Sequence, residues 1–242
     1  MSEKIKGIVI KSNDRKEKDV SVLLFSLEKG LIWVTLRGVK NPNAKMKLAQ
    51  NQFSFGEFVI ENGKASQIVT QFELIESFQE IAQDVDKYFE ASAVLEAVEK
   101  IRFSSEQEQA KVFVLTLRAL KSICFGKVKQ TYSLCKFFIE LFKICGFGLF
   151  SEKCTCCGTK TFDRLFVNYA VGELVCASCK SLTSEELPKT TYLALKILDG
   201  TDFDRLSTIK LANGSEISLL KVLVKNFEVR FDTKLKLMGI LS

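Results

Sequence analysis

Two cysteine pairs stand out among the residues whose side chains can do chemistry. Cys154 and Cys157 form one Cys-x-x-Cys pair, and Cys176 and Cys179 form a second pair eighteen residues further on. Each pair can aim two sulfur atoms at one point, and four thiolates complete the tetrahedral shell of Zn²⁺. Because a closed shell leaves no position for water, this spacing predicts one structural zinc ion per chain.

The first pair contains a further thiol, Cys156, so Cys154 with Cys156 is an alternative to Cys154 with Cys157. The geometry of a zinc knuckle favours Cys154 and Cys157. Gly158 follows directly, and glycine accepts the left-handed backbone that such a turn often requires. Three other cysteines fall on expected helices, where we interpret them as small core residues: Cys124, Cys135 and Cys145.

The chain contains no histidine, which excludes Ser-His-Asp and Cys-His catalysis and histidine metal ligands. A Gly-x-x-x-x-Gly-Lys phosphate loop is also absent from the sequence. We therefore expect a protein that is not an enzyme. The N-terminal sequence MSEKIKGIVI is charged throughout and does not read as a signal peptide, so we expect a cytoplasmic location with reduced thiols.

Basic residues gather near the N-terminus. Residues 1–50 carry 11 Lys and Arg against 5 Asp and Glu, whereas residues 51–100 carry 3 against 10. Phosphates bind such a basic cluster through Coulomb attraction and counterion release. The charge therefore predicts a nucleic-acid surface, and the candidate contacts are Arg37, Lys40, Lys45 and Lys47 of one loop, with Lys6, Lys11 and Arg15 nearby.

Exposed aromatic rings could add base stacking to this surface. Trp33, the single tryptophan, lies in an apolar stretch, so we expect it in the core, with stacking as the alternative. Phe53 and Phe55 follow the basic loop and carry the same two interpretations.

Five strands must position this surface. The strands are indicated by alternating polar and apolar residues or by apolar runs of residues that favour β-structure. A turn with Asn62-Gly63 joins the last two strands. Five strands with two hairpins and a long loop suit an OB-fold barrel, and an SH3-like barrel would have a similar count. The expected strands are 4–12, 20–27, 31–36, 53–60 and 65–72.

From about residue 84 the apolar period changes to that of helices. Ser105 with Glu108 and Thr183 with Glu186 are candidate capping boxes, and the latter would open a helix that ends at Leu198. The fold class predicted is therefore α+β: an N-terminal OB-fold barrel, then an α-helical domain with an inserted four-cysteine zinc module. We place the domains at 1–80 and 81–242, with the module at about 150–182. Other expected helices cover 85–101, 112–123 and 128–145, and a last helix, after 213–215, has Ile217, Leu220, Val224, Phe227 and Phe231 on one face.

The order of these features resembles the RecO family of recombination mediators over nearly the whole chain. The motifs that carry the resemblance are G-I-V-I-K (7–11), K-D-V-S-V-L-L-F-S-L-E-K-G-L (18–31), the basic loop L-R-G-V-K-N-P-N-A-K (36–45), C-T-C-C-G (154–158), G-E-L-V-C-A-S-C (172–179) and K-L-K-L-M-G-I-L (234–241). Gln50, Phe53 and Phe55 are similar to the run that follows the basic loop in the family. Pro42 and Ala44 depart from the family's loop pattern.

This resemblance implies an OB-fold and a helical domain that in many members carries zinc. It implies a DNA repair protein of the bacterial cytoplasm, associated with the nucleoid, that binds and anneals single- and double-stranded DNA. It further implies partnership with RecR and with single-stranded-DNA-binding protein, and indirectly with RecA. The acidic, apolar tail of single-stranded-DNA-binding protein would meet an apolar groove and basic residues within 102–143.

Two other classes compete with this interpretation. A zinc-ribbon adapter of transcription or translation would use the barrel for RNA or protein. A purely structural scaffold would not account for the basic N-terminal segment.

Overall fold

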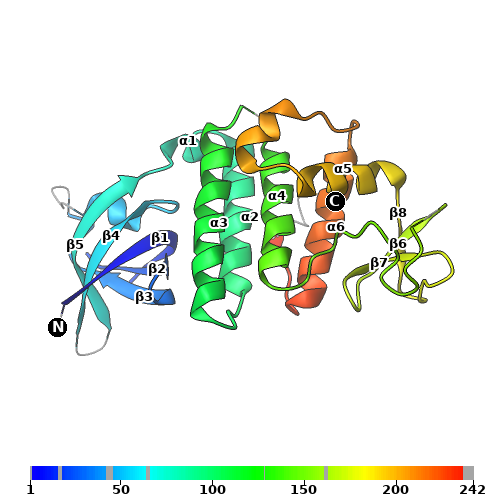
Figure 1. The fold of residues 1–242 in the computed structure, drawn as a ribbon. Helices are drawn as coiled ribbons and strands as arrows, with labels where there is room; N and C mark the ends of the chain where they lie inside the picture. The colour runs from blue at the N-terminus through cyan, green and yellow to red at the C-terminus, as the bar shows by residue number, and fades with distance from the viewer. Residues whose placement is uncertain are drawn as a thin grey trace. The chain divides into compact units, whose positions relative to one another are not determined.

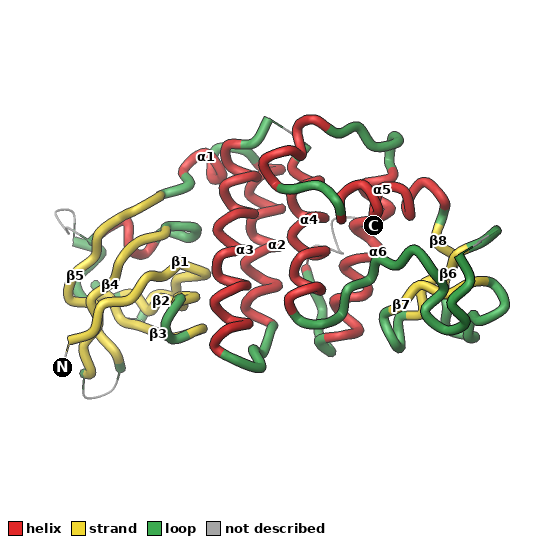
Figure 2. Tube along the Cα trace, viewed as in Figure 1, coloured by secondary structure: helices red, strands yellow, loops and turns green. Residues whose placement is uncertain are grey.

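The computed structural model describes residues 2–15, 18–41, 46–63, 66–127, 129–160 and 163–236. It divides into two compact units (Figures 1 and 2). The barrel unit comprises residues 1–83 and 102–114, and the helical unit comprises 84–101 and 115–242. The domain boundary near residue 80 remains a prediction.

The strands of the barrel unit form a closed five-stranded barrel in the order β1-β2-β3-β5-β4, which is the OB-fold that the sequence predicts. Neighbouring strands are antiparallel except β3 and β5, which pair in parallel through Val34–Leu36. The long strand β1 pairs with β4 along its first half and with β2 along its second half. The strands are β1 (Ser2–Asp14), β2 (Val20–Ser26), β3 (Gly30–Leu36), β4 (Phe55–Asn62) and β5 (Gln67–Glu76).

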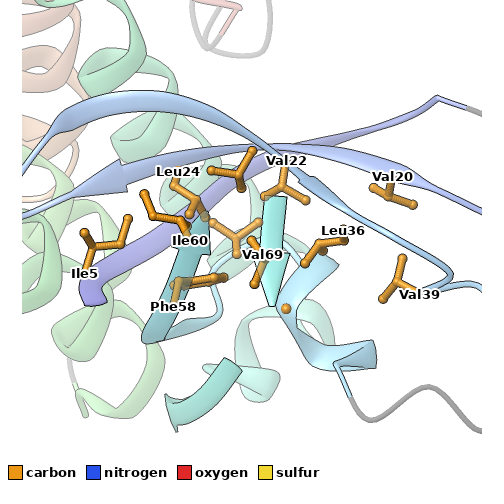
Figure 3. Packing of buried hydrophobic residues seen from close by; sticks show 12 residues of the cluster. Ile5, Val20, Val22, Leu24, Leu36, Val39, Phe58, Ile60 and Val69 are labelled. Carbon is orange, nitrogen blue, oxygen red and sulfur yellow. The ribbon is translucent and has the colours of Figure 1, made fainter. Parts of the chain in front are cut away.

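The barrel interior is filled by branched aliphatic side chains and one large aromatic ring, because alternate residues of each strand point inward. Figure 3 shows this packing around Phe58. The short helix η1 (Lys47–Gln50) contributes Ala49 to the same core. The labelled core residues are Ile5, Val20, Val22, Leu24, Leu36, Val39, Phe58, Ile60 and Val69.

The first half of α3 (Glu106–Phe125) belongs to the barrel unit and packs on the outside of β2 and β4. The Phe113 ring contacts the rings of Phe25 and Phe55, with centroid distances of 5.4 and 6.1 Å. Gln109 donates through Nε2 to the carbonyl oxygen of Leu27 at 3.0 Å. At the start of this helix, the Glu108 N–H donates to Ser105 Oγ at 3.1 Å, as the capping signal predicts.

The helical unit is built around α4 (Gln130–Ile144), which packs against α2, α5 and α6. Aromatic side chains fill this core, and the Phe138 ring lies 5.6 Å from the Phe227 ring of α6. The unit contains α2 (Val85–Lys100), the second half of α3, α5 (Lys189–Asp199), the short helix η2 (Phe203–Thr208) and α6 (Ser215–Arg230). The short helix α1 (Gln79–Ala82) lies in the barrel unit.

The helical unit also holds a small antiparallel sheet in the order β7-β6-β8. Strands β6 and β7 form a hairpin between the two cysteine pairs. The bounds are β6 (Leu165–Asn168), β7 (Glu173–Cys176) and β8 (Glu185–Leu187).

Three local predictions were wrong. Thr183 and Glu186 do not cap a helix, because residues 185–187 pair with β6 as a strand and α5 begins only after Pro188. Asn62 ends β4 rather than occupying a two-residue turn, since it pairs with Gln67. Ile217 is exposed, whereas Leu220, Val224 and Phe227 of α6 are buried as expected.

The cysteines expected in the core lie mostly there. Cys124 and Cys135 are buried, and Cys145 is half-buried just after α4. Among the described residues, no helix combines the length and the apolar character needed to cross a membrane.

Candidate functional site

The first cysteine pair lies on a tight turn that its own backbone closes. The Gly158 N–H donates to the carbonyl oxygen of Cys154 at 2.8 Å, and Gly158 has φ +76°. A residue with a Cβ is strained in that conformation, which explains the glycine. This turn orients the side chains of Cys154 and Cys157.

The second pair begins at the end of β7. Cys176 is the last residue of that strand, and the Cys179 N–H donates to the Cys176 carbonyl oxygen at 3.1 Å. The two turns are joined directly, because the Cys176 N–H donates to Cys154 Sγ at 3.4 Å. The hairpin β6–β7 thus closes the eighteen-residue gap in the sequence.

The four sulfur atoms of Cys154, Cys157, Cys176 and Cys179 all lie within 4.8 Å of one another. Cys157 Sγ and Cys176 Sγ are 3.8 Å apart. Sulfurs placed about 2.3 Å from one tetrahedral zinc ion would be about 3.8 Å apart, so the donor set fits this ion. Cys156 is exposed and is not part of this group.

The environment of Cys154 prepares a thiolate. Burial disfavours the charged form, but hydrogen bonds from the backbone N–H groups of Cys157, Cys176 and Cys156 outweigh burial and lower the pKa of Cys154 to about 6. The other sulfurs close by raise the pKa of Cys179 well above its usual value. Metal binding would therefore have to displace protons from part of the cluster.

A second candidate site lies on the outer face of β1, β2 and β3. Lys11 pairs in register with Leu23, and Leu23 pairs with Trp33, so the three residues form a row across the strands. Trp33 is 44% exposed, which contradicts the expectation that it lies in the core. Lys11 Nζ lies 5.7 Å from the centre of the Trp33 ring.

Arg15 joins the same face from the loop between β1 and β2. Its Nη1 donates to Thr35 Oγ1 at 2.6 Å and to Ser66 Oγ at 3.1 Å. Thr35 lies two residues after Trp33 on β3, so both side chains point to the outer face. Arg15 is thus bound to β3 two residues beyond Trp33, and Lys11 lies over the Trp33 ring.

The basic loop lies at the end of β3. Arg37 and Lys40 are exposed, and Lys40 Nζ forms an ion pair with Asp14 Oδ1 at 2.8 Å. Lys47 begins η1, which closes the barrel core. Lys45 lies outside the described residues.

Lys6 does not lie with the basic residues around Trp33. It lies on the first half of β1, opposite Glu57 of β4, whose carboxylate pairs with Lys4. Exposed acids follow on β4 and β5, including Glu61 and Glu73. The barrel therefore carries basic residues around Trp33 and acidic residues along β4 and β5.

The phenylalanines after the basic loop do not present stacking surfaces. Phe53 is buried, and half-buried Phe55 packs on Phe113. Trp33 is the aromatic residue that the sequence interpretation misplaced. The alternation of β3 contains a signal for its position, because Val34 and Leu36 fill the core and Trp33 lies out of phase with them.

The helical unit contains a basic pocket of about 440 Å³ between the end of α3 and η2. The Arg118 guanidinium lies 5.2 Å from the centre of the Phe203 ring and 3.7 Å from Asp202 Oδ1. Cations and exposed aromatic surface thus share one concavity. The lining residues are Arg118, Lys121, Ser122, Phe125, Gly126, Lys127, Phe203, Asp204 and Ser207.

Comparisons with known proteins agree with this architecture. The family described as Recombination protein O N terminal matches residues 1–78, and the one described as Recombination protein O C terminal matches residues 82–238. The chain is 28% identical to a DNA repair protein RecO of Clostridium novyi (strain NT), over 91% of this chain and 86% of the relative. It is 24% identical to the DNA repair protein RecO of Thermoanaerobacter sp. (strain X514), over 96% and 95% of the two chains.

A third relative, the DNA repair protein RecO of Desulforamulus reducens, is 27% identical over 96% of this chain and 91% of its own. The matches cover both the barrel and the helical region, including the cysteine segment. This chain therefore belongs to the RecO family of DNA repair proteins.

Proposed function

We propose that this protein is a recombination mediator that binds single- and double-stranded DNA, anneals complementary strands and, with RecR, assists recombinase loading on DNA coated by single-stranded-DNA-binding protein. The observation that carries this proposal is the exposed Trp33 residue with Lys11 over its ring, while Arg15 is bound to Thr35 on the same strand. An exposed ring stacks on bases of any sequence, and cations beside it neutralise phosphates. Sequence-independent binding is what a mediator needs.

Annealing follows from concentration and charge. A strand bound to the basic residues loses part of its phosphate repulsion toward a second strand. Two strands held on one protein, or on two protein molecules, also meet at a raised local concentration. No bond is made or broken in this process, so the proposed activity is not enzymatic.

The four-cysteine group would hold one structural Zn²⁺ through Cys154, Cys157, Cys176 and Cys179. A closed four-thiolate shell supplies folding free energy and no catalysis. The cysteine-bearing sheet is tied to α6, because Lys225 Nζ lies 4.8 Å from the centre of the Tyr169 ring and pairs with Glu185. The metal would therefore stabilise the helical unit.

The basic pocket beside η2 suits the acidic, apolar tail of single-stranded-DNA-binding protein. Carboxylates of the tail would meet Arg118, Lys121 and Lys127, and an apolar side chain would meet Phe125 or Phe203. Such contact would bring the mediator to coated DNA in the bacterial cytoplasm, at the nucleoid.

The experiment is strand annealing of two complementary oligonucleotides coated with single-stranded-DNA-binding protein, with the zinc content of the same preparation measured. We expect faster annealing than in the protein's absence and about one zinc per chain. Absence of both annealing and DNA binding at low salt would exclude the mediator function and favour an adapter that binds RNA or protein. Annealing without bound zinc would overturn the metal assignment alone.

A further inference from the structure

An acidic residue, Asp19, lies just before β2 at the basic end of the barrel and connects two loops there. The Gly38 N–H donates to Asp19 Oδ1 at 2.9 Å. The Arg15 N–H donates to the Asp19 carbonyl oxygen at 3.1 Å. Asp19 thus belongs to the loop between β1 and β2, closes that loop through its carbonyl oxygen, and binds the basic loop after β3 through its carboxylate.

The basic loop turns tightly, and its Lys40 N–H also donates to the Lys18 carbonyl oxygen at 3.4 Å. Gly38 has φ +63°, and the Asn41 N–H donates to the Gly38 carbonyl oxygen at 3.1 Å. Val39 within this turn is buried in the barrel core. Its neighbours in the loop, Arg37 and Lys40, are exposed.

Coulomb attraction alone cannot explain an acid at this place, because a carboxylate near a phosphate-binding surface opposes DNA. Resting on the DNA binding proposed above, we propose that Asp19 is a positioning residue of the nucleic-acid surface: its carboxylate accepts the Gly38 N–H and thereby holds Arg37 and Lys40 in position for phosphates. Asp19 itself touches no DNA in this arrangement.

A second acid close by has the opposite role. Asp14 Oδ1 lies 2.8 Å from Lys40 Nζ, and both side chains are partly exposed. This carboxylate competes with DNA phosphate for the same ammonium group. The two acids therefore separate positioning from competition, which allows a test by the sign of the effect.

The test measures binding of a fluorescein-labelled oligo-dT of about 20 nucleotides, longer than one OB barrel covers, to the full-length protein and three variants at several salt concentrations. We expect Asp19→Ala to weaken binding about three- to tenfold, the effect of one lost hydrogen bond. We expect Asp19→Asn, which keeps an acceptor for the Gly38 N–H, to bind at least as tightly as the wild type. Asp14→Ala should bind about two- to threefold more tightly, because Lys40 is freed from a surface ion pair.

The salt dependence separates positioning from a loss of stability. If Arg37 or Lys40 loses its phosphate contact, the slope of log K against log salt becomes shallower by about 0.7 per contact. Partial unfolding instead lowers the amount of protein that can bind and leaves this slope unchanged. Thermal unfolding of each variant fixes the temperature at which all are folded. Equal or tighter binding by Asp19→Ala would overturn the inference, as would equal weakening by Asp19→Ala and Asp19→Asn. Failure of the wild type to bind at low salt would instead overturn the proposed function.

Discussion

Lys11 Nζ lies 5.7 Å from the centre of the Trp33 ring, and the two residues flank Leu23 on the outer face of the barrel. The ring is exposed although it belongs to an apolar strand. An ammonium group over an indole ring is attracted by the negative face of the ring. The same group offers a positive charge to phosphate. This pair therefore connects the fold of the barrel with the proposed binding of single strands.

We expect Trp33→Ala to weaken single-stranded DNA binding about tenfold, because stacking contributes roughly 1–3 kcal/mol per base. Trp33→Phe should retain most of the affinity, and duplex binding should change less, since paired bases cannot stack on the ring. Trp33 is the single tryptophan, so quenching of its fluorescence by oligo-dT measures the contact directly. Tyr88→Ala, which alters an exposed aromatic residue of the helical unit, is the control. Unquenched fluorescence at saturating DNA would contradict the stacking contact.

Charge removal at the basic loop should change both affinity and salt dependence. The variant changes Arg37, Lys40, Lys45 and Lys47 to Ala. We expect weaker binding and a slope of log K against log salt that is shallower by about 3, since each phosphate contact contributes about 0.7 with single strands. The measurement is anisotropy titration at several salt concentrations. A control variant of equal charge changes exposed lysines elsewhere: Lys100, Lys189, Lys210 and Lys221. The assignment fails if both variants lower the slope equally.

The zinc assignment predicts different results for neighbouring cysteines. We expect Cys154→Ser to lose the metal and Cys156→Ser to retain about one zinc per chain, because Cys156 is outside the group of mutually close sulfurs. A chelator should lower the unfolding midpoint by about 5 °C or more, since metal-binding free energy contributes to folding. Zinc content by mass spectrometry and thermal unfolding measure both. Loss of zinc from Cys156→Ser would instead favour the alternative ligand set.

Glu90 predicts a pH dependence of stability. Burial raises the pKa of this carboxyl to about 8; the Thr131 hydroxyl, which donates to Oε1 at 2.7 Å, opposes the rise, and Asp86 and Asp84 add to it. Because the folded state binds this proton more tightly than the unfolded state, stability from this group is present below the ordinary carboxyl pKa of about 4.5 and is lost as pH rises toward 8.

We therefore expect Glu90→Gln to flatten the decline in the free energy of unfolding between about pH 5 and pH 8, and to be more stable than the wild type at pH 8. Denaturant unfolding at several pH values measures this. Glu173→Gln, a change at an exposed position of β7, serves as the control. Identical pH profiles for Glu90→Gln and the wild type would refute the role of Glu90.

The basic pocket predicts selective loss of an acidic partner. We expect Arg118→Ala with Lys121→Ala to weaken binding of a peptide with the acidic, apolar tail sequence about tenfold, because both charges line the pocket. Oligo-dT affinity should change little. Isothermal titration calorimetry measures the affinity for this peptide and for a peptide of the same composition in scrambled order. Equal affinity of the double variant and the wild type for the tail peptide would remove the pocket from the mechanism.

The cysteine group could be predicted from the sequence because its geometry is largely local. Each Cys-x-x-Cys pair lies within one turn, and Gly158 supplies the left-handed backbone that closes the first. The barrel was also predictable in outline, since inward and outward residues alternate along its strands. Residues 185–187 were not, because whether they form a strand depends on pairing with β6, whose partner residues lie about twenty positions earlier.

The sequence by itself determined the ligand types, the absence of histidine chemistry, the strand and helix periods and the excess of positive charge near the N-terminus. Only the tertiary structure decided which of those residues meet. The exposure of Trp33 depends on which face of β3 turns outward, and its contact with Lys11 depends on the register of three strands. The pocket needs η2 to lie beside the end of α3, about eighty residues earlier in the chain. Such contacts arise from packing between distant segments, and composition and spacing along the chain do not specify them.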